Sequence, residues 1–344
     1  MAIHIIKPYI CQIITKPSIL FFLNQALQHY LKSFKRLKRG TTKYGPAPHK
    51  PVMLLSVLQS IQKKVIATNQ IFITPELVFL FKSNWASLVA TDHVCNFALP
   101  FFHLKGEKFW HLIPKPGYEA LLLIKESMSG FAEINGAVQF VVLNEDLYGL
   151  MKDDKSNAIL QQFLLDEYFP VTKGNFSNTN KGQQNLFNTI EKKILEEAPA
   201  TYQKEIKNLM KEQNEEEIYI RGSLFKREVP KIYNYTCCIS DMKIDAITNA
   251  TMIDACHIVP FSESYNDTIT NGIALCPNLH RAFDRGLITI DTNYKVMVSK
   301  VFNENNSNYG LKQFEGKEIS LPSYEKYYPL MDNFDWHRER IYNG

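Results

Sequence analysis

The sequence predicts an α+β fold in which helices alternate with short β-hairpins. Apolar residues recur at helical spacing near the N-terminus, whereas the runs within 99–113 and 287–298 alternate apolar and polar residues around turn-forming residues. An apolar, β-branched run ends at His257, and a polar loop then leads to a short segment that begins with Pro277 and ends before Gly286. Pro and Gly at these places are typical of the two ends of a helix. The 344 residues are enough for two or three domains, each with its own core.

Three helices are expected in the N-terminal part. Ser18 is expected to cap the first, whose apolar face consists of Leu20, Leu23, Leu27, Leu31, Phe34 and Leu37. The second follows a Gly/Pro-rich loop and runs from Pro51 to about Lys64. Thr74 and Pro75 begin the third, with Leu77, Leu80, Phe81, Trp85 and Leu88 buried.

The middle of the chain predicts a hairpin, a linker and charged helices. Residues 99–104 and 108–113 alternate about the turn 105–107, which predicts a β-hairpin. An amphipathic stretch at 135–170 is expected to complete the first domain. Residues 174–182 are polar and bounded by glycines, as in a flexible linker. Residues 185–217 predict one or two charged helices, broken near Pro199.

Positive charge is concentrated at the N-terminal end. Residues 1–75 contain eleven Lys or Arg and no acid before Glu76, although the net charge of the whole chain is only +4. Such a segment is a candidate surface for a polyanion, and the alternative is an ordinary solvated face. No apolar run approaches the ~20 residues that a membrane span needs. Six scattered cysteines suit a reducing cytoplasm, and we expect no secretory signal.

His257 and His280 are the strongest candidates for chemistry. A strand, a loop and a helix bring the two imidazoles to a common point. Phosphodiester hydrolysis needs a base near neutrality, which imidazole supplies, and a cation that offsets charge on the phosphate and on the leaving oxygen. We therefore assign His257 as the base, His280 as a metal ligand, and Asn271 as the amide that braces the intervening loop.

These residues resemble the HNH endonuclease family, whose fold is the ββα-metal finger. The resemblance rests on the order His257, Asn271, His280, on the flanks Ala-Cys-His-Ile-Val-Pro and Leu-His-Arg-Ala-Phe-Asp-Arg-Gly, and covers about residues 233–299. It implies one divalent ion per centre, Mg²⁺, Mn²⁺, Co²⁺ or Ni²⁺. Many relatives place an Asp or His directly before the base as a second ligand. This chain has Cys256 there, and Asp254 lies on the same face of the strand, so either residue is a candidate.

A second resemblance covers about residues 30–170. The segment 39–51 (Arg-Gly-x-x-Lys-Tyr-Gly-x-Ala-Pro-His-Lys-Pro), Thr-Pro-Glu-Leu at 74–77, and the segments 97–104 and 109–117 are similar to the sulfur-recognising domain of modification-dependent (type IV) restriction enzymes. That domain binds DNA with a phosphorothioate, in which sulfur replaces a non-bridging oxygen. The resemblance implies an apolar cup with a cationic rim, because sulfur is softer and less hydrated than oxygen. The candidate DNA- and sulfur-binding residues are His49, Lys50, Leu99, Pro100, Phe101, Lys105, Arg36 and Arg39, with Lys125 as an alternative to Lys105. The alternative is that His49 caps a helix and that Leu99 and Pro100 fill the core.

Further cations and cysteines flank the proposed nuclease centre. Arg221, Arg227, Arg281 and Arg285 are candidates for contacts with DNA phosphates, and so is Lys226. The alternative for Arg221, Lys226 and Arg227 is that they are ordinary surface bases. Cys237, Cys238, Cys276 and His280 do not have the paired Cys-x-x-Cys spacing of a structural zinc site, so we expect none.

The expected organisation is an uncertain extension at 1–29, a sulfur-recognising mixed helix/β-hairpin domain at 30–172, a helical spacer at 173–220 and a ββα-metal HNH domain at 221–344. The expected function is a cytoplasmic restriction endonuclease in phage defence that binds phosphorothioate-modified double-stranded DNA and acts as a homodimer. Two alternatives stay open: an HNH endonuclease that reads another modification or a defined unmodified sequence, and a DNA-binding regulator with an inactive nuclease fold.

Overall fold

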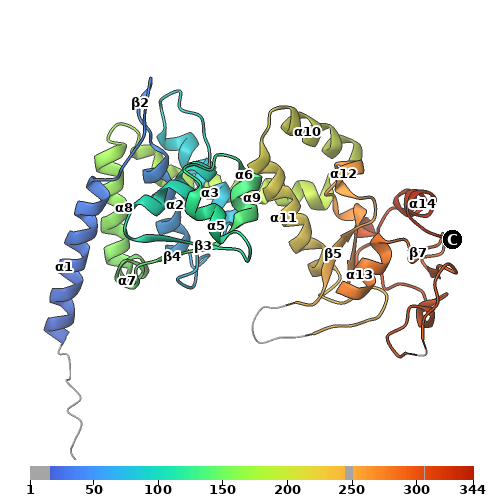
Figure 1. Ribbon diagram of the computed structural model, residues 1–344. Helices are drawn as coiled ribbons and strands as arrows, with labels where there is room; N and C mark the ends of the chain where they lie inside the picture. Colours follow the sequence, from blue (N-terminus) through green and yellow to red (C-terminus); the bar gives the residue numbers. More distant parts are fainter. Residues whose placement is uncertain (1–15, 245–250, 306) are drawn as a thin grey trace, which may run out of the picture. The chain divides into compact units, whose positions relative to one another are not determined.

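The computed structural model describes residues 16–244, 251–305 and 307–344, with side chains omitted for 16–24 and 177–186 (Figure 1). It divides into two compact units, one of residues up to 73 with 80–179, and one of 74–79 with 180–344. The first half of the expected 1–29 extension lies outside the described residues, and its second half belongs to helix α1, Lys16–Lys35. The domain boundaries expected from the sequence stay predictions.

The first unit is built around α2, which is buried along most of its length. Every residue from Lys50 to Ile61 is buried, because α2 packs against α4, α7 and α8. The elements of this part of the chain are α1, β1 Thr41–Thr42, β2 Gly45–Pro46, α2 His49–Gln62, α3 Pro75–Leu88, α4 Ala98–His103, η1 Leu104–Gly106, β3 Trp110–Pro114, α5 Glu119–Ile124, α6 Phe131–Ala137, β4 Val138–Leu143, α7 Glu145–Lys152 and α8 Asp154–Tyr168. The three helices expected in this part are present.

The prediction of a β-hairpin at 99–113 is wrong. Residues 98–106 form α4 and the 3₁₀ turn η1, and β3 pairs instead with β4, antiparallel, in the register Trp110↔Leu143. The side chain of Asn96 accepts a hydrogen bond from the amide of Leu99 and so supports the start of the helix. Phe101, Phe102 and Leu104 are all fully buried. Burial on several sides hides the helical period, so the run read as alternation.

The prediction of a flexible linker at 174–182 is also wrong. These residues form the first turns of the continuous helix α9, Gly174–Glu196. The charged helices expected at 185–217 are present as the later part of α9 and as α10, Pro199–Lys211, with the break just before Pro199. A further helix, α11, Glu215–Ile232, follows and was not expected.

The second unit surrounds a two-stranded sheet and a short helix. β5, Asp254–His257, pairs antiparallel with β6, Gly272–Leu275, so that His257 lies opposite Gly272. Pro277 begins α13, Pro277–Asp284, and Gly286 follows it with φ +65°, as expected. The remaining elements are α12 Phe261–Ser264, η2 Ile269–Asn271, β7 Ile288–Ile290, β8 Val296–Val298, η3 Lys312–Phe314, η4 Glu325–Tyr327 and α14 Met331–Arg340.

One hydrophobic core joins these elements. Phe225 and Val229 from α11 pack with Ile273 and Leu275 from β6, and Phe283 from α13 packs in the same cluster. The hairpin expected at 287–298 is present as β7 and β8. The core therefore fixes the strand that carries His257 and the helix that carries His280. Among the described residues, no helix has both the length and the apolar character that a membrane span requires.

Candidate active site

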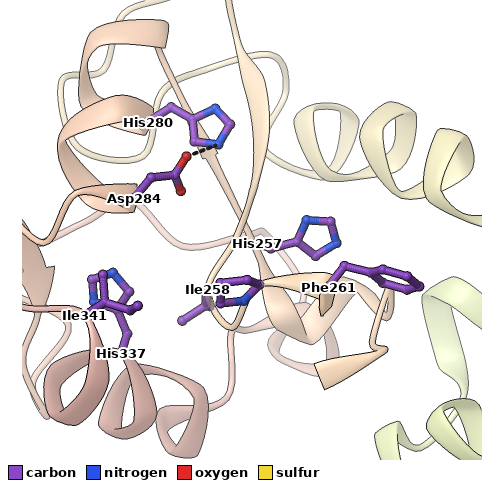
Figure 2. Close-up of a pocket in the computed structure, with 8 residues that line it drawn as sticks. His257, Ile258, Phe261, His280, Asp284, His337 and Ile341 are labelled. Atoms are coloured by element: carbon purple, nitrogen blue, oxygen red, sulfur yellow. Dashed lines mark ion pairs between the residues drawn. The ribbon is translucent and has the colours of Figure 1, made fainter. Parts of the chain in front are cut away.

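A pocket of about 340 Å³ in the second unit contains both histidines that the sequence singled out. His257 and His280 line it together with Ile258, Pro260, Phe261, Asp284, His337 and Ile341. Figure 2 shows His280 and Asp284 projecting from the same helix toward one another, and His257 projecting from the neighbouring strand. A single space is thus open to both imidazoles.

His257 is held by a stacked ring and by a carboxylate. Its imidazole lies 3.9 Å from the ring of Phe225 at an interplanar angle of 13°. Nε2 lies 2.9 Å from Oδ1 of Asp267, whose side chain is buried. Nδ1 of His257 makes no hydrogen bond to any residue that the structure describes. The ring is therefore fixed in plane and in rotation, with one nitrogen left for chemistry.

Asn271 closes the loop between the two strands. Its side-chain oxygen accepts a hydrogen bond of 3.0 Å from the amide of Val259. Its Nδ2 donates to the carbonyl oxygens of Val259 at 2.9 Å and Asn266 at 3.0 Å. The residue is fully buried, so it has no direct access to a substrate. Its contacts suit the bracing role expected of it.

His280 stands between two carboxylates. Nδ1 lies 3.3 Å from Oδ2 of Asp254 on β5, and Nε2 lies 3.5 Å from Oδ2 of Asp284 on its own helix. Cys256 adds a buried sulfur, 3.9 Å from Oδ1 of Asp284. In the part of the chain that the structure describes, one ligand atom from each of Cys256, His280 and Asp284 lies within 4.8 Å of the others.

Residues 237–291 match the family model of the HNH endonucleases. This segment is therefore an HNH endonuclease domain. A solved structure of a modification-dependent TagI restriction endonuclease is similar at 20% identity and a TM-score of 0.26. The similarity covers 34% of this chain and 37% of the other, and a likeness of this extent carries no functional argument. No curated protein matches the sequence significantly.

The cluster of Cys256, His280 and Asp284 fits a small divalent cation. Imidazole nitrogen, carboxylate oxygen and thiolate sulfur are all ligands of first-row divalent metals, and the half-exposed His280 and exposed Asp284 leave room for a substrate oxygen. Burial, together with the nearby Asp284 carboxylate, raises the pKa of the Cys256 thiol well above its usual value. The thiol is therefore protonated without a cation, and its ligation would release a proton.

Asp284 and Asp267 are functional candidates that sequence reasoning missed. Asp284 follows His280 by four residues, a spacing that places two side chains on the same face of a helix, so it was detectable from the sequence. Asp267 belongs to a polar loop, and nothing in its local sequence separates it from its neighbours.

The four cysteine and histidine residues considered for zinc do not form a metal cluster in the described part of the chain. Cys238 is fully buried. The thiol of Cys276 donates a hydrogen bond to Oδ1 of Asn278 at 3.0 Å. The proximity of Cys276 lowers the pKa of Cys237, and the proximity of Cys237 raises the pKa of Cys276. His280 belongs to the cluster with Cys256 and Asp284.

Two of the four expected DNA-contacting arginines are committed to protein carboxylates. Arg221 is 1% exposed and pairs with Glu205 and Glu217, so it is too deep to reach a phosphate. Arg227 is partly exposed, but its charge is offset by Glu76, Glu191 and Glu228. The sequence shows that each guanidinium is charged but not that carboxylates already bind it, and contact of Arg227 with DNA stays a prediction. Arg281 and Arg285 are exposed on and just after α13, next in sequence to the pocket residues His280 and Asp284. Lys226 is exposed on α11.

The first unit contains a second pocket of about 450 Å³. Its lining includes five of the eight expected DNA- and sulfur-binding residues, namely Arg39, His49, Lys50, Leu99 and Pro100. Sequence reasoning missed the other lining residues, which are Lys38, Gly40, Thr42, Ala47, His103 and Gly106. The segment 38–50 and the start of α4 thus meet at one apolar pocket with cations around it.

Two cations of this pocket are restrained by protein contacts. The ammonium of Lys50 lies 2.7 Å from Oε1 of Glu107, and both side chains are about nine-tenths buried. The same carboxylate oxygen accepts a hydrogen bond from the amide of Lys38. His49 donates from Nε2 to the carbonyl of Val94, and burial lowers its pKa. Neither Lys50 nor His49 acts as a freely solvated charge.

Three residues expected in the sulfur site do not line this pocket. Phe101 is fully buried in the core, where its ring contacts Phe97 and Trp110. The ammonium of Lys105 donates to the carbonyls of Leu122 and Lys125, and lies 3.8 Å from the ring of Phe102. Arg36 is exposed at the end of α1. The alternative Lys125 pairs with Glu133. For Phe101 and Lys105, the sequence predicted a hairpin where α4 and η1 lie, so it did not show which way these side chains point.

Proposed function

We propose that the protein is a modification-dependent DNA endonuclease, with a reader at about residues 30–172 and an HNH nuclease at about 221–344. The observation that carries the nuclease part is the pocket shared by His257 and His280, with Asp254, Cys256 and Asp284 around the second imidazole. The substrate is double-stranded DNA, and the reaction is hydrolysis of a phosphodiester.

His257 is the proposed base. Nδ1, which has no partner among the described residues, takes a proton from water as the water oxygen attacks phosphorus. The bond from phosphorus to the 3′ oxygen breaks, which leaves a 5′-phosphate and a 3′ hydroxyl after that oxygen gains a proton from solvent. Asn271 keeps the loop that follows His257 closed, so the imidazole stays aimed at the pocket.

His280, Asp284 and Cys256 are the proposed ligands of one divalent cation, with Asp254 in reach of His280. When bound, the cation supplies positive charge to the phosphate and to the leaving oxygen. Among Mg²⁺, Mn²⁺, Co²⁺ and Ni²⁺, the last three suit a set that contains sulfur and imidazole better than Mg²⁺ does.

The pocket of the first unit is the proposed reader of a phosphorothioate. Leu99, Pro100 and Ala47 supply apolar surface, which favours a large and weakly hydrated sulfur over a phosphate oxygen. Lys38 and Arg39 supply charge at the same pocket, while Lys50 is neutralised by Glu107. Because one of the cations around the pocket is neutralised, the attraction for any phosphate is weaker. The contact with apolar side chains is then the interaction that distinguishes sulfur from oxygen.

Cutting both strands requires two HNH centres, so we propose a homodimer or paired action on one site. An enzyme of this kind would serve restriction in the cytoplasm, in defence against phage.

Two experiments test the proposal. Binding of matched duplexes that differ only in one phosphorothioate should favour the sulfur-bearing duplex, and equal affinity would remove the sulfur reader. His257→Ala and His280→Ala should abolish nicking and preserve DNA binding, so retained nicking in either variant would refute the HNH assignment. If the wild-type protein cuts no modified DNA with any of the four cations, the regulator with an inactive nuclease fold is the better description.

A further inference from the structure

We propose that Asp267 is a positioning residue for the nuclease, which fixes the ring tautomer and direction of His257, and that Tyr202 of α10 holds Asp267 in turn. This inference rests on the proposed role of His257 as the base. It adds to the HNH centre two residues that lie outside the His-Asn-His pattern, one of them 55 positions before the base in the chain.

Asp267 contacts both groups with separate oxygens. Oδ1 lies 2.9 Å from Nε2 of His257, and Oδ2 lies 3.5 Å from the hydroxyl of Tyr202. Asp267 is 2% exposed and Tyr202 is fully buried, so water does not compete for these contacts. A buried carboxylate requires such partners, since an unpaired one is strongly disfavoured.

The carboxylate selects one form of the imidazole. An ionised carboxylate only accepts hydrogen bonds, so Nε2 must carry the proton and Nδ1 must keep its lone pair. The parallel stack on Phe225 prevents the ring from turning away. The neutral ring therefore presents a proton acceptor to the pocket before any substrate binds.

Charged residues of α10 and α11 surround the Tyr202 ring. The guanidinium of Arg221 lies 5.4 Å from the centre of the Tyr202 ring and pairs with Glu205 of α10 and Glu217 of α11. These pairs join α10, which carries Tyr202, to α11. A Cβ added at Gly222 would lie 3.9 Å from Oδ2 of Asp267, which shows how closely α11 approaches the carboxylate.

The test uses the full-length protein and two readouts. In ¹⁵N-histidine spectra recorded in the presence of a chelator, the signals lost in His257→Ala identify His257. The wild-type protein should show the Nε2-protonated tautomer at this residue. Asp267→Asn should lose the strong preference for it, because an amide can donate as well as accept.

The second readout is single-turnover cleavage. Asp267→Asn should slow cutting by about 10²-fold or more, as expected when a base is in the wrong tautomer, with unchanged affinity for DNA. Tyr202→Phe should give a smaller loss of about threefold to tenfold, because Asp267 keeps its contact with His257. Asp332→Asn removes an exposed carboxylate of the same unit and should behave like the wild type.

The outcomes separate this inference from the proposed function. An inactive His257→Ala with a fully active, folded Asp267→Asn overturns the positioning role alone, and so does an Nδ1-protonated ring in the wild-type spectrum. An active His257→Ala overturns the role of the base itself. If Asp267→Asn does not fold, the wild-type spectrum and Tyr202→Phe decide, and wild-type cutting by Tyr202→Phe removes the tyrosine from the proposal.

Discussion

Gly272 is a position at which one methyl group should disturb both the core and the base. It lies opposite His257 in the β5–β6 pair, and a Cβ built on it would lie 2.6 Å from Val229 and 2.8 Å from the ring of Phe225. Its φ of −130° and ψ of 143° are ordinary for alanine. Any effect of Gly272→Ala therefore comes from the overlap and not from backbone strain.

The size of the effect follows from the burial of the two neighbours. Phe225 and Val229 are fully buried and belong to the hydrophobic core, so neither can move into solvent. Overpacking of this kind destabilises a protein by about 1–3 kcal/mol. For a unit of this size, that lowers Tm by roughly 2–4 °C per kcal/mol. Because Phe225 stacks on His257, we also expect slower nicking with unchanged DNA affinity.

Thermal unfolding and single-turnover nicking check this expectation. Phe225→Leu should relieve part of the overlap, so the double variant should be more stable than the sum of the two single changes predicts. Gly149→Ala is the control, since no atom lies within 4 Å of its added Cβ, and it should be neutral or slightly stabilising. Wild-type stability and nicking in Gly272→Ala would refute the close packing behind His257.

Four further expectations concern the cation site, the pH dependence of stability and the proposed reader. Asp284→Ala should raise the cation concentration for half-maximal nicking at least about tenfold, as loss of one ligand does, and a chelator should stop nicking by the wild type. Cys256→Ser should improve nicking with Mg²⁺ relative to Co²⁺, as a titration of each ion would show. Burial lowers the pKa of His337 to about 4. The unfolded chain then binds the extra proton, so stability should fall by about 3 kcal/mol as the pH drops from about 6.5 toward 4, and urea unfolding of His337→Gln should show a shallower fall. Leu99→Ser should reduce the preference for phosphorothioate over plain DNA in a binding competition and leave affinity for plain DNA nearly unchanged.

Local signals in the sequence were sufficient for much of the second unit. Pro277 and Gly286 bound α13, and the strand expected to end at His257 is present as β5. The hairpin expected at 99–113 failed because residues 98–104 are buried on several sides, so neither a helical nor a strand period is visible there. Residues 174–182 read as a linker from composition, yet they continue into the amphipathic helix α9. Tertiary contacts decide such segments, and composition does not record them.

Some residues of the candidate site could likewise be found from the sequence, and others only from the structure. His257, Asn271 and His280 follow from a pattern of 24 positions, and the structure brings both histidines to one pocket. Asp267 and Tyr202 are 65 positions apart, and only the packing of α10 makes them neighbours. Arg221 was misread for the complementary reason, because a sequence shows that a guanidinium is charged and not that two carboxylates have already bound it.

The ion pair between Lys50 and Glu107 has a consequence for how the protein searches DNA. Each phosphate neutralised by a cation releases counterions and adds about 0.9 to the slope of log affinity against log salt. Lys50 already has a counter-charge 2.7 Å away inside the protein, so it has few counterions to exchange. If this pocket binds DNA as proposed, the contribution of Lys50 should then weaken little as ionic strength rises, while that of exposed cations such as Lys38 weakens steeply. The protein would then stay bound to a phosphorothioate longer than to unmodified DNA, and the difference would be greatest at high salt concentration.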